Sequence, residues 1–114
     1  YISVTGVQTC ALPIFPADIV YEDEHCIAIR DINPQAPVHV LLIPKKPLDR
    51  LSNAQPADQA LLGHLMVTVG TLTRQLGIEN AFRLAVNNGA DAGQSVFHLH
   101  LHILGGRALS WPPG

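Results

Sequence analysis

Charged side chains are scarce in this sequence. Asp, Glu, Lys and Arg make up 14% of the 114 residues, the formal net charge is −2, and no basic run occurs. Such a chain has no long-range attraction for a polynucleotide or an acidic membrane, so we expect it to bind neither. Hydrophobic residues reach 47%, and so low a charged fraction indicates that a partner covers some apolar surface. A second copy of the chain is the simplest such partner, so we expect a homo-oligomer.

Cysteine is nearly absent, and long hydrophobic runs are missing. Cys10 and Cys26 are the two thiols, and their spacing is not that of a metal-binding motif. The apolar runs are far shorter than the roughly 20 residues that cross a bilayer. With a length of about one domain, the sequence predicts a single domain in a reducing cytoplasm.

The first fourteen residues follow neither a helical nor a strand pattern. They have no basic start before an apolar core, so they are not a signal peptide. Residues 5–14 resemble translated sequencing-adaptor read-through. We therefore expect residues 1–14 to be extraneous and the domain to span 15–114.

From residue 15 onward the hydrophobic periodicity predicts strands around one helix. The helix carries apolar residues at three- and four-residue steps, with a proline in its first turn and Gly77 just past its end. The expected elements are strands over 19–22, 26–29, 39–43, 82–86 and 98–104 and a helix over 56–76. This order predicts an α+β fold, in which one long helix covers one face of an antiparallel five-stranded sheet.

The run over 98–104 places a histidine at every second position of an apolar strand. Because successive side chains of a strand point to opposite faces, Leu99, Leu101 and Ile103 are expected in the core. His98, His100 and His102 would then form a row on the other face, with α-carbons about 6.5 to 7 Å apart. Three imidazoles in such a row fit around one small substrate.

A polar, glycine-containing loop over 87–95 precedes this run. Such a loop presents backbone N–H groups to an anion, so loop and strand together predict a phosphate site. A neutral imidazole is a good nucleophile at pH 7, and the flanked His100 is the natural candidate. We expect His39 to fix its tautomer, the amides of residues 93–95 to stabilise the oxyanion, and His102 or Ser95 to relay a proton.

The pattern His-apolar-His-apolar-His-apolar-apolar resembles the signature of the histidine triad (HIT) superfamily. Further stretches resemble its nucleotide-binding (Hint) branch, namely 31–39, 43–46, 61–66, 93–96 and 111–114. The resemblance implies a homodimeric purine nucleoside phosphoramidase that cleaves AMP–amine conjugates and aminoacyl adenylates. It further implies a nucleotidyl-histidine intermediate and no metal or other cofactor. The branch also has a short N-terminal helix, which residues 1–14 do not match.

Carried over by position, the resemblance makes His100 the nucleophile, with His102, His98, His39 and Ser95 as catalytic neighbours. It assigns Phe15, Ile29 and Ile32 to the purine and Asp31 to the ribose. The residues expected around the phosphate are Asn87, Gly93, Gln94, Ser95 and Val96, together with His98 and His102. Trp111 is expected on the leaving-group side of a neighbouring subunit's site.

Several alternatives stand beside this interpretation. A His-x-His pair is typical of metal sites, but three histidines on one straight strand span too far to close easily on one ion. His39 is also compatible with a hydrogen-bonded core position, and Asp31 with a turn cap. His25 and His64 are expected to be structural or solvated. The alternative function is a nucleotide-binding regulatory module with little turnover.

Overall fold

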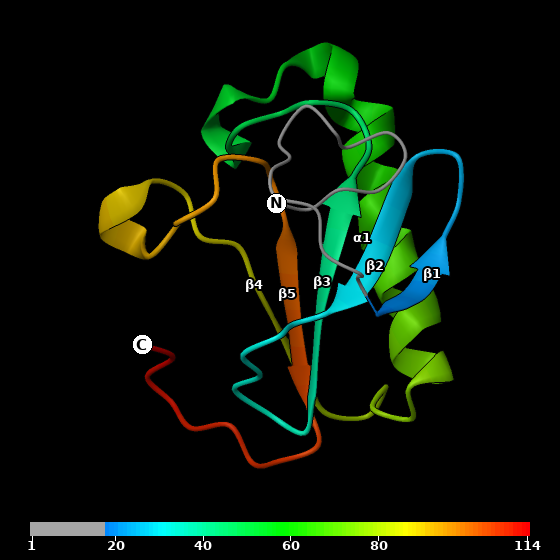
Figure 1. Ribbon diagram of the computed structural model, residues 1–114, viewed down its shortest axis with the longest axis vertical. Helices are drawn as coiled ribbons and strands as arrows, with labels where there is room; N and C mark the ends of the chain where they lie inside the picture. Colours follow the sequence, from blue (N-terminus) through cyan, green and yellow to red (C-terminus); the bar gives the residue numbers. More distant parts are fainter. Residues whose placement is uncertain (1–17) are drawn as a thin grey trace.

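The computed structural model describes residues 18–114, so residues 1–14 and Phe15 lie outside the described part. The strands are β1 (Ile19–Glu22), β2 (Cys26–Arg30), β3 (Val38–Pro44), β4 (Phe82–Ala85) and β5 (Leu101–Gly105), and the helix is α1 (Gln59–Gln75). The 3₁₀ turns within residues 18–114 are η2 (Leu51–Asn53), η3 (Pro56–Asp58) and η4 (Ala90–Ala92). The five strands form one antiparallel sheet in the order β1-β2-β3-β5-β4, and α1 packs across one face (Figure 1). The predicted α+β fold is confirmed.

The helix begins later than its apolar pattern predicts because its first turn is 3₁₀ rather than α. A capping box joins Gln55 and Asp58, with Pro56 at the start of η3. Asp58 also accepts a hydrogen bond from Lys46, which ties this turn to the segment after β3. The helix ends before Gly77, whose φ of 73° is a conformation that glycine adopts readily. Across residues 18–114, no helix has both the length and the apolar character needed to span a bilayer.

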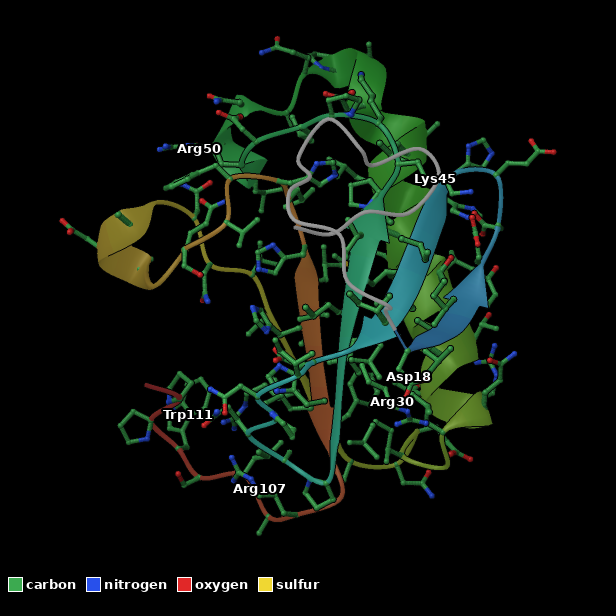
Figure 2. All side chains as sticks on the ribbon, viewed as in Figure 1. Asp18, Arg30, Lys45, Arg50, Arg107 and Trp111 are labelled. Atoms are coloured by element: carbon green, nitrogen blue, oxygen red, sulfur yellow. The ribbon has the colours of Figure 1, made fainter. Side chains whose placement is uncertain are left out.

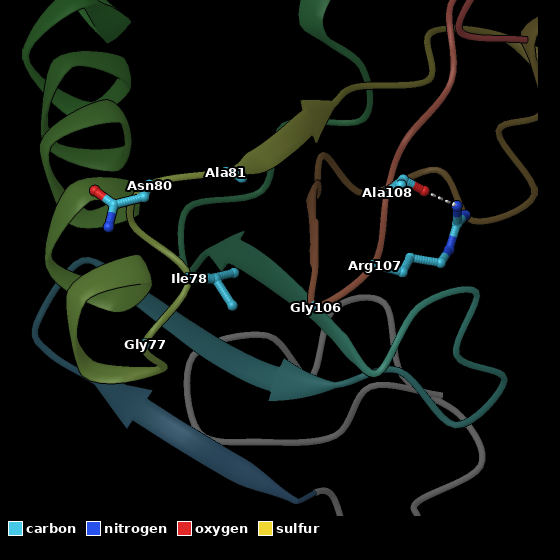
Figure 3. Close-up of a pocket in the computed structure, with 7 residues that line it drawn as sticks. All are labelled: Gly77, Ile78, Asn80, Ala81, Gly106, Arg107 and Ala108. Carbon is cyan, nitrogen blue, oxygen red and sulfur yellow. Dashed lines mark hydrogen bonds between the residues drawn. The ribbon is translucent and has the colours of Figure 1, made fainter.

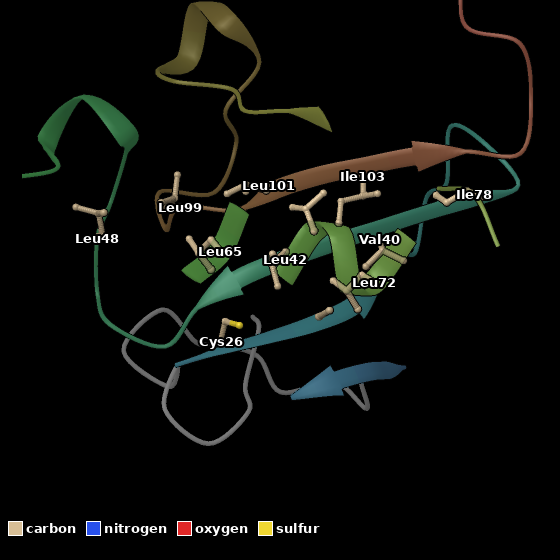
Figure 4. Close-up of a cluster of buried hydrophobic side chains, with 12 residues drawn as sticks. Cys26, Val40, Leu42, Leu48, Leu65, Leu72, Ile78, Leu99, Leu101 and Ile103 are labelled. Atoms are coloured by element: carbon tan, nitrogen blue, oxygen red, sulfur yellow. The ribbon is translucent and has the colours of Figure 1, made fainter. Parts of the chain in front are cut away.

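The core lies between α1 and the facing side of the sheet (Figure 4). Its members are Cys26, Ala28, Val40, Leu42, Leu48, Leu65, Val69, Leu72, Ile78, Leu99, Leu101 and Ile103. Because side chains alternate along a strand, burying Val40 and Leu42 against the helix sends His39 to the opposite face. Leu101 and Ile103 do the same for His102 on β5. Core packing thereby places two histidines together on the side of the sheet that α1 does not cover.

The strand that carries the histidines is shorter than predicted. It begins at Leu101, so His98 and His100 precede it. The last residue pair of the β3–β5 ladder is Leu42 with Leu101, and the Leu99 amide instead donates to the Leu48 carbonyl at 2.7 Å. The expected burial of Leu99, Leu101 and Ile103 is confirmed.

Candidate active site

His39 and His102 join neighbouring strands through their rings. The Nε2 atom of His39 lies 2.9 Å from the Nδ1 atom of His102. In the β3–β5 register Leu41 is opposite His102 and His39 is opposite Leu104, so the two histidines are diagonal neighbours on one face. We expected His39 to contact His100 and fix its tautomer. That expectation is wrong, because the ring of His39 contacts His102 instead.

The hydrogen bond at His39 Nδ1 determines the tautomer of this ring. The Gln35 backbone N–H donates to His39 Nδ1 at 3.0 Å, and an amide has only a proton to offer. Burial lowers the pKa of His39, with the Asp31 charge acting in opposition, so the ring is neutral near pH 7. The single ring proton then resides on Nε2 and is donated to His102 Nδ1. Asp31 Oδ2, 3.4 Å from the same nitrogen, lies beside this bond.

His102 therefore accepts at Nδ1 and carries its own proton on Nε2. Burial lowers the pKa of His102 to about 4, and the neighbouring His100 and His39 rings act in the same direction. The Nε2 atom is buried and has no hydrogen-bond partner among residues 18–114. A buried donor without an acceptor costs about 1 to 3 kcal/mol, so this N–H is suited to an acceptor supplied by a ligand.

His100 has the opposite tautomer. Its Nδ1 atom lies 2.8 Å from the carbonyl oxygen of His98, and a carbonyl can only accept, so Nδ1 carries the proton. The lone pair is thereby left on Nε2, the atom a nucleophilic imidazole uses. The ring centroids of His100 and His102 are 5.0 Å apart in an edge-on arrangement. The site thus places a free lone pair beside a free N–H donor.

His98 does not stand in the row that the sequence predicts. Its side chain is buried, and its Nε2–H donates to the Pro44 carbonyl at the end of β3 at 2.8 Å. Burial lowers the pKa of His98. His98 thus anchors the entry into β5, while its own carbonyl orients His100.

The loop before the histidines is closed by its own hydrogen bonds. The Gly93 amide donates to Ala90 and the Gln94 amide to Gly89, so neither is available to an anion as the sequence predicted. Gly89 and Gly93, with φ of 90° and 96°, provide the turns that these bonds need. No hydrogen bond within residues 18–114 engages Ser95, which is exposed and retains its amide and hydroxyl for a ligand.

Gln94 is the buried centre of this loop. Its Oε1 accepts from the Gly89 amide at 2.7 Å, and its Nε2 donates to the carbonyls of Asp49 at 2.8 Å and Val96 at 3.1 Å. All polar groups of the side chain are thus engaged within the chain. This gives Gln94 a role in holding the loop shape, and the predicted contact with a nucleotide remains a prediction.

The other predicted ligand contacts occupy varied environments. Ile29 is buried, whereas Ile32 is 91% exposed. Asp31 accepts a hydrogen bond from the Asn33 amide at 2.8 Å, which matches the turn-cap interpretation. Asn87 lies against Gly93, since a β-carbon on that glycine would lie 3.6 Å from Asn87 Nδ2. Val96 is half-buried beside the loop.

Trp111 lies on the C-terminal tail, which turns back beside the β4 edge (Figure 2). The indole is 80% exposed, and the Arg83 guanidinium lies 5.8 Å from its ring centroid. Arg83 is two residues before Ala85, which pairs with His102, so it points to the same face as the histidines. Arg83 was not predicted from the sequence. The available signal was strand alternation, because Arg83 is the one charged residue of the predicted 82–86 strand and must point to one of its two faces.

Two further features bear on where a ligand binds. The donor atoms of Asp31, His39 and His102 lie within 4.8 Å of one another, close enough for a metal ion, although each ring nitrogen that faces the group already takes part in a hydrogen bond. A separate hollow lies beyond the ends of α1 and β5 (Figure 3). It is lined by Gly77, Ile78, Asn80, Ala81, Gly106, Arg107 and Ala108. It contains no histidine, and Arg107 there donates to the Gln35 and Ala108 carbonyls.

Comparison with known proteins agrees with this geometry. The family model of the HIT domain matches residues 14–109. An uncharacterised HIT-like protein of Synechocystis sp. is 67% identical over 99 residues, which cover 87% of each chain. The structure of a HIT family hydrolase from Legionella pneumophila superposes with a TM-score of 0.85 at 42% identity, over 88% of this chain and 90% of that one. A histidine triad nucleotide-binding protein from Candida albicans gives 0.73 at 27%, over 88% and 77%. The chain therefore belongs to the HIT family.

Proposed function

We propose that this protein is a purine nucleoside phosphoramidase of the Hint branch, which hydrolyses the P–N bond of AMP–amine conjugates and of related aminoacyl adenylates. The observation that carries the proposal is the Nδ1–H bond of His100 to the His98 carbonyl, which leaves the His100 Nε2 lone pair free. Support also comes from the HIT hydrolase of Legionella pneumophila and the nucleotide-binding relative from Candida albicans.

In the first step, His100 Nε2 attacks phosphorus and the P–N bond breaks. Negative charge builds on the non-bridging oxygens, and in this proposal His102 Nε2–H and the Ser95 amide donate hydrogen bonds to them. The neutral His102 ring is a poor acid, so the exposed Ser95 hydroxyl relays the proton that the departing amine takes from water. The products of this step are the free amine and AMP bound to a cationic His100.

In the second step, water attacks phosphorus and the bond between His100 and AMP breaks. The water proton returns to solvent, so the proton taken up in the first step is released again. The net reaction is hydrolysis of the conjugate to an amine and AMP, with His100 restored. Dividing the reaction in this way lets one site perform two in-line displacements in turn.

The substrate contacts of the proposal are those that the family resemblance implies. Asp31 binds the ribose hydroxyls, and Ile29 and Ile32 border the purine together with Phe15. Asn87 and Val96 flank the phosphate. Trp111, with Arg83 beside it, shapes the leaving-group side. The active form is a homodimer.

The decisive experiment is quenched-flow mass spectrometry after mixing the protein with an AMP–amine. An adduct of one AMP is expected on the peptide that contains residues 98–102. His100→Ala is expected to lose the adduct and several orders of magnitude in the chemical step while still binding AMP. His25→Ala, in the exposed β1–β2 turn, is the matched control and keeps both.

Two outcomes would contradict the proposal. Full activity in His100→Ala, or an adduct on a different histidine, would leave direct attack by water as the better mechanism. AMP binding without any turnover of the conjugate would favour the regulatory module instead. A steady-state assay on the same AMP–amine distinguishes these two cases.

A further inference from the structure

A second group of donor side chains lies on the helix side of the sheet, across from His39 and His102. Asp23 is in the β1–β2 turn, Cys26 begins β2, and His64 is in α1. One donor atom from each lies within 4.8 Å of the other two. We propose that these three residues bind one thiolate-preferring divalent cation of the zinc class. The site is separate from the histidine run, where the sequence predicts no metal.

The turn and the helix hold these donors in place before any ion arrives. Asp23 Oδ1 accepts from the backbone amides of His25 at 2.7 Å and Cys26 at 2.9 Å, which fixes the carboxylate over the turn. The Cys26 sulfur lies 3.5 Å from the same oxygen. On the other side, His64 Nε2 lies 2.7 Å from Asp23 Oδ2. The three ligands therefore come from the β1–β2 hairpin and from α1, which the core already packs together.

The donor set is the one that zinc-class ions select. A thiolate, an imidazole and a carboxylate bind Zn²⁺ at about 2.0 to 2.3 Å, and tetrahedral geometry then separates the ligand atoms by roughly 3.3 to 3.8 Å. The His64–Asp23 hydrogen bond must open, and the other separations must close by up to about 1 Å. The His64 Nε2 proton and the Cys26 thiol proton are released to solvent.

Access and charge also favour an ion at this position. Cys26 is fully buried, whereas the side chains of Asp23 and His64 are 23% and 37% exposed, so the cluster opens to solvent on one side. That side admits water as a fourth ligand. The nearby cation Lys45, at the same end of the sheet (Figure 2), is paired with Glu22 at 2.7 Å, which offsets its repulsion.

The test is a titration of the full chain with Co²⁺, followed by competition with Zn²⁺. Cobalt bound to a thiolate gives a sulfur-to-metal charge-transfer band in the near ultraviolet, which reports cysteine ligation independently of catalysis. We expect one Co²⁺ per chain, with the band displaced by Zn²⁺. Cys26→Ser is expected to lose the band. The matched control Cys10→Ser, which removes the other thiol of the chain, retains it.

Two more variants test the imidazole ligand and the face of the sheet on which the ion binds. His64→Gln, at a partly exposed position, is expected to weaken Co²⁺ binding by at least about tenfold without disturbing the core. His102→Asn is expected to leave the band unchanged, because the Asp31, His39 and His102 group lies on the other face. Circular dichroism checks that Cys26→Ser is folded.

The proposal is overturned if the wild-type chain gives no charge-transfer band. A band that survives Cys26→Ser, or binding of unchanged strength in His64→Gln, also overturns it. Each of these results would identify the three residues as a hydrogen-bonded cluster that joins the β1–β2 turn to α1 and does nothing more.

Discussion

The Nε2 atom of His39 and the Nδ1 atom of His102 lie 2.9 Å apart and connect the backbone of the 31–37 turn to the candidate active site. The bond has a direction. The Gln35 amide donates to His39, His39 donates to His102, and the proton on His102 Nε2 is left for a ligand. A peptide N–H thereby determines which nitrogen of the His102 ring carries the proton.

The first prediction concerns His39→Ala. Without the ring, His102 is free to place its proton on either nitrogen, and its Nε2–H is no longer held toward the phosphoryl oxygen. We expect kcat on an AMP–amine to fall about tenfold to a few hundredfold, by analogy with other tautomer-fixing partners. The AMP adduct on His100 should still form, since the His100 tautomer depends on the His98 carbonyl. Nitrogen-15 NMR of His102 measures the tautomer directly.

A matched pair at position 35 controls for packing. Gln35→Ala keeps the backbone N–H that contacts His39 and should leave the His102 tautomer unchanged, whereas Gln35→Pro removes that donor. If both variants have the same His102 spectrum and kcat, the amide does not set the tautomer. A His39→Ala protein with wild-type kcat would likewise show that the relay is structural only.

The histidine relay also shows where prediction from sequence reached its limit. Periodicity was sufficient for the elements and for the burial of Leu99, Leu101 and Ile103, because these depend on local alternation. The partner of His39 depends on the register between β3 and β5, which is set by packing between strands far apart in the chain. For the same reason the sequence could not show that the β5 ladder ends at Leu101.

The 87–95 loop was predicted from its composition to bind phosphate, but its internal hydrogen bonds were not predicted. A glycine-rich stretch suggests free amides, yet two of the three expected donors close the loop on itself. This happens because Gly89 and Gly93 allow a tight turn in which an N–H meets a carbonyl three to five residues earlier. Buried Gln94 completes the turn. Nothing in the local sequence distinguishes that role from contact with a ligand.

The second prediction follows from the buried amide of Gln94. Gln94→Ala removes one acceptor and two donors, leaving the Gly89 amide and the carbonyls of Asp49 and Val96 without their partner. We expect a loss of about 2 to 3 kcal/mol in the free energy of unfolding and a rise in KM. Urea denaturation and steady-state kinetics measure the two effects.

Asp91→Ala, at an exposed position of the same loop, is the control and should change neither quantity appreciably. A Gln94→Ala protein as stable as wild type would show that water replaces the side chain. A rise in KM without any loss of stability would instead support the predicted contact with the nucleotide.

The third prediction is a loss of stability between pH 6.5 and about 4. In the unfolded chain histidine titrates near 6.5, whereas burial lowers the pKa of His102 to about 4 and also lowers those of His39 and His98. As pH falls through this window, the unfolded state takes up protons that the folded state does not, so the free energy of unfolding decreases. The His102 contribution is about 2 kcal/mol, allowing for its partial exposure.

Urea midpoints at pH 7 and pH 4.5 measure this loss, and His102→Gln should reduce it. Asp23 affects the free energy of unfolding in a lower pH range. Burial by itself would raise the pKa of Asp23. Hydrogen bonds from the His25 and Cys26 amides and from His64 outweigh that effect and hold the pKa well below its ordinary value. Its contribution is therefore lost only below about pH 4. If wild type and His102→Gln lose the same free energy of unfolding between pH 7 and pH 4.5, the assignment to His102 is contradicted.

The last prediction concerns the homodimer and the exposed face of α1. Val67 and Met66 are 72% and 53% exposed, although the opposite side of the helix forms the core. Ala60 and Gly63 precede Val67 on the same helical stripe, and such small side chains allow another surface to approach closely. We expect a second copy of the chain to cover this face.

Val67→Glu buries a charge in that contact and should weaken dimerisation by about a hundredfold or more. Gln75→Glu adds the same charge at an exposed position near the end of α1 and is the matched control. Light scattering at micromolar concentration should then find dimers for wild type and Gln75→Glu, and monomers for Val67→Glu. A dimeric Val67→Glu would move the interface away from this face, and a monomeric wild type would contradict the homodimer itself.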